Sequence, residues 1–303
     1  MKRLAIATRR SRLALWQAGH VKQRLEALHP GLGIELLPIT TRGDELIDQR
    51  LDQAGGKGLF VRELENALAD GRADIAVHSM EDVPADVPAG FELAVILARE
   101  DAHDAFVSNR YATLEDMPAG AVVGTSSLRR SAQILERYPA LEMRLLRGNV
   151  ETRIAKLDRG DYDAVVLAVA GLTRLGLGSR IRTQLALELS LPAPGQGALG
   201  IETLAARLEL RSLLAPLADR GTALCVRAER AVSRALGGSC TIPLAAYAEV
   251  HGARLRLRAL VASSDGRRVA RAQAEGDDPE MLGAKVALEL RQRGADDILS
   301  DLA

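Results

Sequence analysis

The chain has 303 residues, and its 40 Lys and Arg residues balance 40 Asp and Glu residues, so the formal net charge is zero. A composition of 47% hydrophobic and 26% charged residues is typical of a folded globular protein and excludes disorder as the main state. The missing basic excess argues against a nucleic-acid binder, and the length predicts two or three domains with room for a large core.

Short apolar strands and amphipathic helices alternate over the first two-thirds of the chain. The first strands are predicted at residues 4–7, 34–39, 75–77 and 93–97. One helix is predicted to begin after Ser11, a candidate N-cap, and a second carries apolar residues over 60–68 and ends at Gly71. This alternation indicates βαβ units and a mostly parallel sheet.

A second group of the same kind follows. Strands are predicted at residues 121–124, 143–146 and 163–170, the last one fully apolar and therefore of the buried parallel kind. The helix after the first of these strands is expected to present Leu128, Ala132 and Leu135 on its apolar face. Breaks in the pattern near residues 99–104 and 191–197 mark segments between domains.

The pattern changes from about Thr222 onward. A helix is predicted near residues 224–236, antiparallel strands at 243–250, 254–261 and 268–274, and a closing helix over 279–293. The sequence thus predicts an α/β fold class with parallel-rich sheets and a small C-terminal α+β domain.

The small number of cysteines and the lack of long apolar stretches indicate the cellular compartment. Two cysteines cannot form a disulfide framework, and no Cys or His cluster has zinc-site spacing, so no metal is expected. The N-terminal residues lack the apolar run of a signal peptide, and no apolar stretch approaches the roughly 20 residues of a membrane span. We therefore expect a cytoplasmic protein that binds no membrane.

Arginine and hydroxyl side chains gather where predicted strands end. The hydroxyl residues 125–127 lead into a helix whose first turn carries Arg129 and Arg130, and Arg147 follows the next strand. Because ligands of open α/β sheets bind at the carboxyl ends of strands, these cations indicate a polycarboxylate or phosphate ligand. The alternative is an N-cap beside two solvated arginines. Arginine also dominates the composition, at 35 residues against five lysines, for which a GC-rich genome is the simpler explanation.

Two further residues are candidates for chemistry. Asp82 lies in the polar turn at the carboxyl end of a predicted strand and suits a general acid or base, unless it is a turn or capping residue before Pro84. Cys240 lies in a glycine-rich loop as an accessible nucleophile, whereas Cys225 falls inside a predicted helix as a small hydrophobe. The glycine pattern of residues 195–200 is interpreted as a crossover between domains rather than a dinucleotide site, because two prolines precede it.

Many short motifs match one family in the family's own order. The matching stretches are residues 6–9, 13–17, 41–44, 55–60, 73–80, 104–108, 124–130, 146–149, 167–172, 195–202, 228–230 and the Cys240 loop. From about residue 4 to about residue 299, the chain resembles the porphobilinogen deaminase (hydroxymethylbilane synthase) family. The resemblance implies two lobes like those of periplasmic binding proteins, residues 1–98 with 198–216 and residues 99–197, and a cysteine-bearing domain, residues 217–303.

The resemblance also implies an activity. The family's enzymes are transferases that condense four porphobilinogen molecules into linear hydroxymethylbilane and release ammonia. Their dipyrromethane cofactor is held by a thioether to a loop cysteine, which matches Cys240, and their catalytic aspartate matches Asp82. A carboxylate beside pyrrole N–H groups can stabilise developing positive charge and shuttle a proton. The expected partners are porphobilinogen and the growing pyrrole chain, with no nucleic acid and no membrane, and a monomer is expected.

Each pyrrole carries an acetate and a propionate, so the family's cleft must hold many carboxylates, a task that suits bidentate arginine. The resemblance assigns to this cleft Arg9, Ser11, Lys57, Ser79, Thr125, Ser126, Ser127, Arg129, Arg130, Arg147, Arg153 and Arg174.

Four positions depart from the family's pattern. Glu81 and Gln53 stand where the family has lysines, Ser239 replaces the glycine before the cysteine, and Arg12 replaces a common proline. A glutamate about 4 Å from a ligand carboxylate costs about 1–4 kcal/mol in Coulomb repulsion. The departures support an alternative, in which the chain is a divergent paralogue that binds an anionic small molecule or porphyrin precursor with little or no catalysis.

Overall fold

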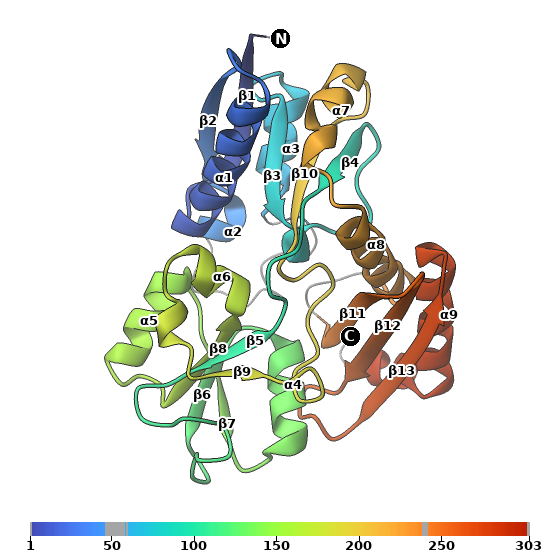
Figure 1. The fold of residues 1–303 in the computed structure, drawn as a ribbon. Helices are drawn as coiled ribbons and strands as arrows, with labels where there is room; N and C mark the ends of the chain where they lie inside the picture. The colour runs from blue at the N-terminus through green and yellow to red at the C-terminus, as the bar shows by residue number, and fades with distance from the viewer. Residues whose placement is uncertain (1, 46–57, 59, 238–241, 302–303) are drawn as a thin grey trace.

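The computed structural model describes residues 2–45, 58, 60–237 and 242–301. Two five-stranded sheets form two lobes, and a third unit beside them carries the C-terminal sheet and helices (Figure 1). The chain passes between the two lobes twice, because residues 199–204 return to the first sheet after the second sheet is complete. None of the helices in the described ranges is long and apolar enough to cross a membrane.

The first lobe is a mixed sheet covered by helices. Its strands lie in the order β2, β1, β3, β10, β4, with bounds β1 Arg3–Arg9, β2 Gly33–Ile39, β3 Ile75–Ser79, β4 Phe91–Ile96 and β10 Leu199–Leu204. β1 is parallel to β2 and β3, whereas β10 is antiparallel to β3 and β4. The helices of this lobe are α1 (Arg12–Leu28), α2 (Arg42–Glu45), α3 (Arg62–Ala69) and α7 (Leu208–Leu214). Because side chains alternate along a strand, α1 and α7 pack on one face and α3 on the other.

The second lobe repeats this plan. Its strands lie in the order β7, β6, β8, β5, β9, with bounds β5 Asp104–Val107, β6 Val122–Thr125, β7 Glu142–Leu145, β8 Ala164–Ala168 and β9 Thr183–Leu185. β6 is parallel to β7 and β8, whereas β5 is antiparallel to β8 and β9. The helices α4 (Leu128–Arg137), α5 (Val150–Asp158) and α6 (Val169–Arg174) complete it. α4 packs on one face, and α5 and α6 pack on the other.

The third unit is an antiparallel sheet with helices on one face. It contains β11 (Leu244–His251), β12 (Arg254–Ala262) and β13 (Val269–Gly276), together with α8 (Arg220–Ala235), α9 (Pro279–Gln292) and α10 (Ala295–Ser300). Inward residues of the strands, such as Leu257 and Ala259, pack against Val232 of α8 and Val286 of α9. The predicted α/β class with two lobes and a small C-terminal domain is confirmed.

Three local predictions need correction. The strand predicted over 163–170 ends at Ala168, where α6 begins, because an apolar run does not distinguish a buried strand from a buried helical turn. The helix predicted over 60–68 begins at Arg62, so Phe60 lies in the turn before it. The buried face of α4 is largely polar, with Arg129, Arg130 and Gln133 beside Ala132 and Ile134, whereas Leu128 and Leu135 are only half-buried.

Candidate active site

A cleft of about 620 Å³ lies where the two lobes face each other. The ends of β1 and β3, the first turns of α1, α4 and α5, and residues of α6 and α8 line it. The predicted site residues that line it are Arg9, Ser11, Ser79, Asp82, Ser126, Ser127, Arg129, Arg130, Arg147, Arg153 and Arg174. Thr125 is buried behind this wall, where its Oγ1 accepts a hydrogen bond from the Ser127 N–H at 3.2 Å. Lys57, Gln53, Ser239 and Cys240 lie outside the described residues.

Asp82 closes a short turn, η1 (Met80–Asp82), that follows β3. Arg9 Nη1 donates to Asp82 Oδ2 at 3.3 Å, and 34% of the Asp82 side chain is accessible within the cleft. Burial raises the pKa of Asp82, and the charge of Arg9 offsets only part of that rise. A carboxyl whose pKa is closer to neutral pH than usual is better able to take up and return a proton.

Arg230 of α8 fixes the segment that follows Asp82. Its guanidinium donates to the carbonyl oxygens of Val83 at 3.0 Å, Pro84 at 2.6 Å and Ala85 at 3.0 Å. Burial, with a contribution from Arg234, lowers the pKa of Arg230 to about 10. The turn that carries Asp82 is therefore held from the third unit. Sequence reasoning missed this contact because no local pattern links residues 147 positions apart.

Arg9, at the end of β1, is held on three sides. Its Nη2 donates to Asp44 Oδ1 at 2.5 Å, its Nη1 reaches Asp82, and its guanidinium lies 4.1 Å from the centroid of the Phe60 ring. Burial alone would raise the pKa of Asp44, but the hydrogen bonds and charge of Arg9 and the hydrogen bonds from Thr41 lower it overall. Sequence reasoning did not identify Asp44, although it lies in the family-like stretch 41–44.

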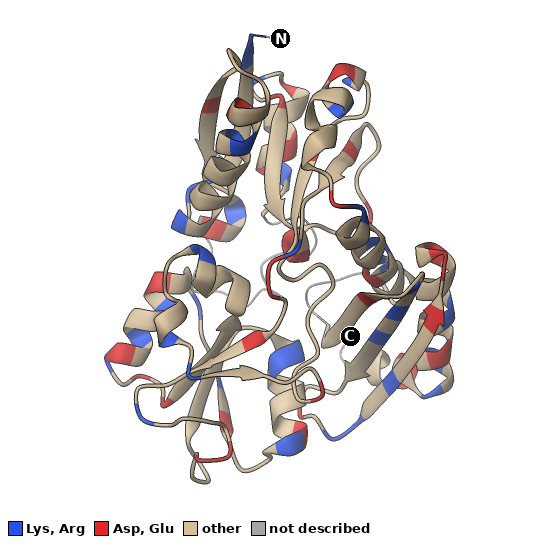
Figure 2. Ribbon diagram, in the orientation of Figure 1, with Lys and Arg blue, Asp and Glu red and all other residues tan. Residues whose placement is uncertain are grey.

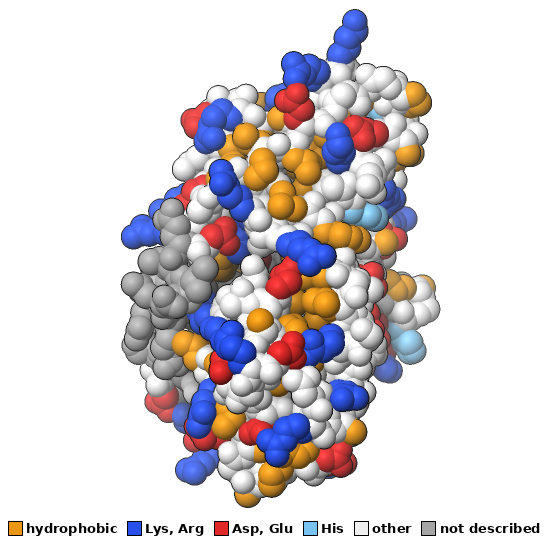
Figure 3. Space-filling model, turned by 90° about the vertical axis from the view of Figure 1, so that its left-hand side faces the viewer, with side chains coloured by type: hydrophobic (Ala, Val, Ile, Leu, Met, Phe, Trp, Pro, Cys, Tyr) orange, Lys and Arg blue, Asp and Glu red, His pale blue; other side chains and the backbone are white. Residues whose placement is uncertain are grey.

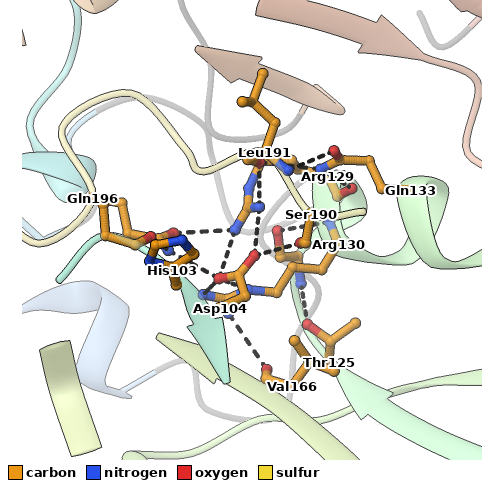
Figure 4. Close-up of polar contacts among 12 residues, drawn as sticks. His103, Asp104, Thr125, Arg129, Arg130, Gln133, Val166, Ser190, Leu191 and Gln196 are labelled. Carbon is orange, nitrogen blue, oxygen red and sulfur yellow. Dashed lines mark hydrogen bonds and ion pairs between the residues drawn. The ribbon is translucent and has the colours of Figure 1, made fainter. Parts of the chain in front are cut away.

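Asp104, the first residue of β5, is the centre of a buried polar cluster (Figure 4). Its carboxylate accepts hydrogen bonds from Arg129 Nη1 at 2.7 Å, Arg130 Nε at 2.8 Å, Ser190 Oγ at 2.6 Å and Gln196 Nε2 at 2.9 Å. Figure 2 shows the acidic start of β5 beside the basic first turn of α4. Burial alone would raise the pKa of Asp104, but the two arginines hold it well below its usual range.

The two adjacent arginines, Arg129 and Arg130, make different contacts in this cluster. Arg129 also donates to Leu191 O at 2.7 Å and Gln196 Oε1 at 3.1 Å, so both of its Nη atoms are engaged. Arg130 contacts Asp104 through Nε and Nη2 and has one long bond, 3.5 Å, from Nη1 to Val166 O. A guanidinium has five N–H donors, so Arg130 retains donors for a ligand, whereas Arg129 chiefly supports the cluster.

Serine hydroxyl groups stabilise the turns at the edge of the cleft. Ser127 Oγ accepts a hydrogen bond from the Arg130 N–H at 3.4 Å, and Ser11 Oγ accepts one from the Ala14 N–H at 3.3 Å. These contacts confirm both residues as N-caps. Ser79 Oγ accepts a hydrogen bond from Gln17 Nε2 at 2.8 Å, which joins the end of β3 to α1.

Further arginines bring positive charge to the cleft from the second lobe. Arg153 Nε donates to Gly148 O at 2.8 Å, and burial together with Arg130 and Arg147 lowers the pKa of Arg153 to about 10. Arg174 Nη2 donates to Gly197 O at 2.7 Å. Burial and the nearby positive charges of Arg130 and Arg147 both disfavour the charged form of Arg153, so carboxylates bound beside it would stabilise that form. On the outer face seen in Figure 3, basic and acidic side chains are instead interspersed.

Glu81 lines the same cleft beside Asp82. Burial and the neighbouring charge of Asp82 raise the pKa of Glu81, and Arg130 and Arg129 offset part of the rise. Glu81 therefore lies close to the arginines that would also attract ligand carboxylates.

Cys225 is buried as predicted, and burial, with the charge of Glu229, raises the pKa of its thiol to about 11. Within the described residues, no group of His, Cys, Asp and Glu side chains could hold a metal ion.

Comparisons with known proteins identify the family of this chain. A family model described as "Porphobilinogen deaminase, dipyromethane cofactor binding domain" matches residues 4–212, and "Porphobilinogen deaminase, C-terminal domain" matches residues 223–292. A porphobilinogen deaminase of Bordetella parapertussis is 59% identical, over 100% of this chain and 97% of that protein. One of Thiobacillus denitrificans is 57% identical, over 100% of this chain and 99% of that protein. A solved structure, the periplasmic aliphatic sulphonate binding protein of Escherichia coli, is 14% identical with a TM-score of 0.41, over 77% of this chain and 70% of that chain. The chain belongs to the porphobilinogen deaminase family.

Proposed function

We propose that this chain condenses four porphobilinogen molecules into linear hydroxymethylbilane, with release of ammonia, on a dipyrromethane primer. Membership of the family and the match of residues 4–212 to its cofactor-binding domain support this activity. The structural observation on which the proposal chiefly rests is a cleft of about 620 Å³ in which Asp82, a carboxyl with a raised pKa, faces arginines of both lobes.

The proposal divides the chain into three domains. Residues 1–98 with 198–216 carry Asp82, residues 99–197 carry most of the anion-binding arginines, and residues 217–303 carry Cys240. The chain passes between the two lobes twice, and this supports the division between the first domain and the second. That the protein works as a cytoplasmic monomer, without nucleic-acid or membrane partners, remains a prediction from the sequence.

The side chains of the cleft fit a dipyrromethane group, because its acetate and propionate groups need cationic partners. We assign the carboxylates to the arginines that line the cleft, Arg9, Arg130, Arg147, Arg153 and Arg174, with Arg129 in support. The hydroxyl groups of Ser11, Ser79, Ser126 and Ser127 and the ammonium of Lys57 complete the assigned set, whereas Thr125, which does not line the cleft, supports the Ser127 turn from behind. The proposed attachment is a thioether to Cys240. When bound, the group supplies the free pyrrole carbon from which the chain grows.

Asp82 is the proposed catalytic residue. Its carboxylate can accept hydrogen bonds from pyrrole N–H groups and stabilise the positive charge that develops as ammonia leaves the substrate. It can then take the proton that is released once the new carbon–carbon bond has formed, and its raised pKa makes it a better base for this step. Arg9 and Arg230 keep the carboxyl and its turn in place during both steps.

The cofactor assignment is tested by intact-protein mass spectrometry. The wild-type protein is expected to carry an adduct with the mass of two pyrrole units, which Cys240→Ser loses. Cys225→Ser, which alters the buried thiol, is the matched control and is expected to keep the adduct. A wild-type protein without any adduct would contradict the assignment.

The role of Asp82 is tested by porphobilinogen consumption. Asp82→Asn keeps the size of the side chain and removes its proton transfer, so kcat is expected to fall by about 100- to 10,000-fold while the protein stays folded. Near-normal turnover of this variant would exclude Asp82 as the catalytic residue. A loaded, folded wild-type protein that consumes no porphobilinogen would instead indicate a binding protein.

A further inference from the structure

One guanidinium in the cleft joins two carboxylates. Arg9 Nη1 donates to Asp82 Oδ2 at 3.3 Å, whereas Arg9 Nη2 and Nε donate to Asp44 Oδ1 and Oδ2 at 2.5 and 3.4 Å. The Arg9 and Asp44 side chains are each 22% exposed, so the pair is largely shielded from solvent. A bidentate pairing of this kind fixes the plane of the guanidinium, and therefore also the direction in which Nη1 points.

Asp44 has its own support, which does not involve Asp82. The Thr41 N–H and Oγ1 donate to Asp44 Oδ2 at 3.2 and 2.7 Å, which locks the carboxylate at the start of α2. The Phe60 ring lies beneath the Arg9 guanidinium, and a Cβ at Gly43 would overlap that ring. The turn at the start of α2 therefore supplies a fixed carboxylate to Arg9, and Gly43 leaves room for the Phe60 ring, which comes from the turn before α3.

We propose that Asp44 is a positioning residue for the condensation: it orients Arg9 toward Asp82 and divides the charge of the guanidinium between the two carboxylates. The proposal rests on the proposed function of Asp82. Asp44 acts through Arg9 and needs no contact with the substrate.

Their surroundings shift the pKa values of Asp44 and Asp82 in opposite directions. The pKa of Asp44 is lowered, because Arg9 and Thr41 outweigh burial, so Asp44 stays charged. The pKa of Asp82 is raised by burial, and while Arg9 lowers it, the negative charge of Asp44 raises it further. By competing for Arg9, Asp44 leaves Asp82 the stronger base. When the pKa values of two neighbouring carboxyls differ in this way, one stays ionised and the other transfers the proton. Here Asp44 is the ionised group and Asp82 the proton-transferring one.

Other titratable or charged groups lie around Asp82 on neighbouring elements. They are His78 on β3, Glu81 in η1, Arg153 on α5, and the cleft-lining Arg130 on α4, Arg147 before α5, Arg174 on α6 and Arg230 on α8. A substitution of Asp44 changes none of these side chains. A change in the pKa of Asp82 in such a variant therefore reports on Asp44 and Arg9.

The pH dependence of kcat/KM in the Asp44→Asn holoenzyme tests the proposal. Without the Asp44 charge, Arg9 acts on Asp82 alone, so the acid limb of the profile is expected to move to lower pH by about one unit. The loss of orientation is expected to lower kcat at the optimum by about 10- to 100-fold. Asp44→Glu retains the charge and is expected to keep the wild-type limb. Asp158→Asn, which removes an exposed carboxylate paired with Arg180 outside the cleft, is the matched control.

The same pKa can be measured without turnover. With carboxyl-¹³C aspartate, the Asp82 resonance is identified by its loss in Asp82→Asn, and its titration midpoint is expected to fall in Asp44→Asn. The proposal would be overturned if, in Asp44→Asn, the acid limb of kcat/KM and the titration midpoint of Asp82 stay in place or move to higher pH. An Asp44→Asn protein that fails to fold or to load its cofactor would also overturn it, because Asp44 would then serve assembly. If Asp82→Asn remains active, the proposed function of Asp82 fails instead, and the midpoint still decides the effect of Asp44.

Discussion

The Asp104 cluster predicts a large loss of stability from a nearly isosteric change. Asp104 is 0% exposed and pairs with Arg129 at 2.7 Å and with Arg130 at 2.8 Å. Asparagine in its place would turn N–H donors toward two buried guanidinium groups and leave both without a counter-charge. Removing one partner of a buried ion pair costs about 3–5 kcal/mol. We expect Asp104→Asn to lower the free energy of unfolding by about this amount.

Urea unfolding followed by far-ultraviolet circular dichroism measures this loss. The control is again Asp158→Asn, whose carboxylate pairs with Arg180 at 2.6 Å but is 47% exposed. Exposed pairs contribute about 0–1 kcal/mol, so the control is expected to change the free energy of unfolding by no more than that. An Asp104→Asn protein that loses no more than the control would refute the reasoning about the cluster.

The lowered pKa of Asp104 sets the pH range in which the cluster stabilises the fold. Because the folded pKa lies below the unfolded value of about 3.9, the carboxylate stabilises the folded state above that value. This contribution is lost as the pH falls below the unfolded pKa toward the folded one. Asp104→Asn is therefore expected to show a smaller loss of unfolding free energy below about pH 4 than the wild type. Equal acid losses in the two proteins would contradict this assignment.

Two further variants probe the cleft. Glu81→Lys replaces a repulsive charge by an attractive one beside the arginines, so the KM for porphobilinogen is expected to fall; an unchanged KM would mean that Glu81 does not face the ligand. Arg230→Lys replaces a fork that reaches three carbonyl oxygens by a single ammonium, so kcat is expected to fall by about 10- to 100-fold with an unchanged circular dichroism spectrum. A variant that is less stable but fully active would contradict this positioning role.

Local signals in the sequence were sufficient for most of the fold. The alternation of strands and helices, the caps at Ser11 and Ser127, and the position of Asp82 in the turn after β3 all depend on residues within a few positions of one another. The end of β8 at Ala168 could not be predicted in the same way. The next residues are equally apolar, and whether they continue as strand or helix depends on the packing of α6 against the sheet.

The roles of the arginines depend on contacts between distant residues. Arg129 and Arg130 are adjacent and chemically identical in the sequence. In the structure Arg129 is committed to Asp104, Leu191 and Gln196, whereas Arg130 keeps donors toward the cleft. The carbonyl oxygen of Leu191 lies 62 positions away from Arg129, so no periodicity or motif could separate the two arginines.

The zero net charge of the chain conceals a strong local imbalance that the fold itself creates. Arginines from both lobes converge on one cleft, where the pKa of Arg153 falls to about 10 under burial and the charges of Arg130 and Arg147. Asp44 and Asp104 neutralise part of this cluster and hold three of its members, Arg9, Arg129 and Arg130, in fixed orientations. Burial and the neighbouring charges of Arg130 and Arg147 disfavour the charged form of Arg153, and bound carboxylates would offset this effect. A ligand with many carboxylates therefore stabilises the folded state as well as occupying the site, because binding to the folded form alone shifts the unfolding equilibrium.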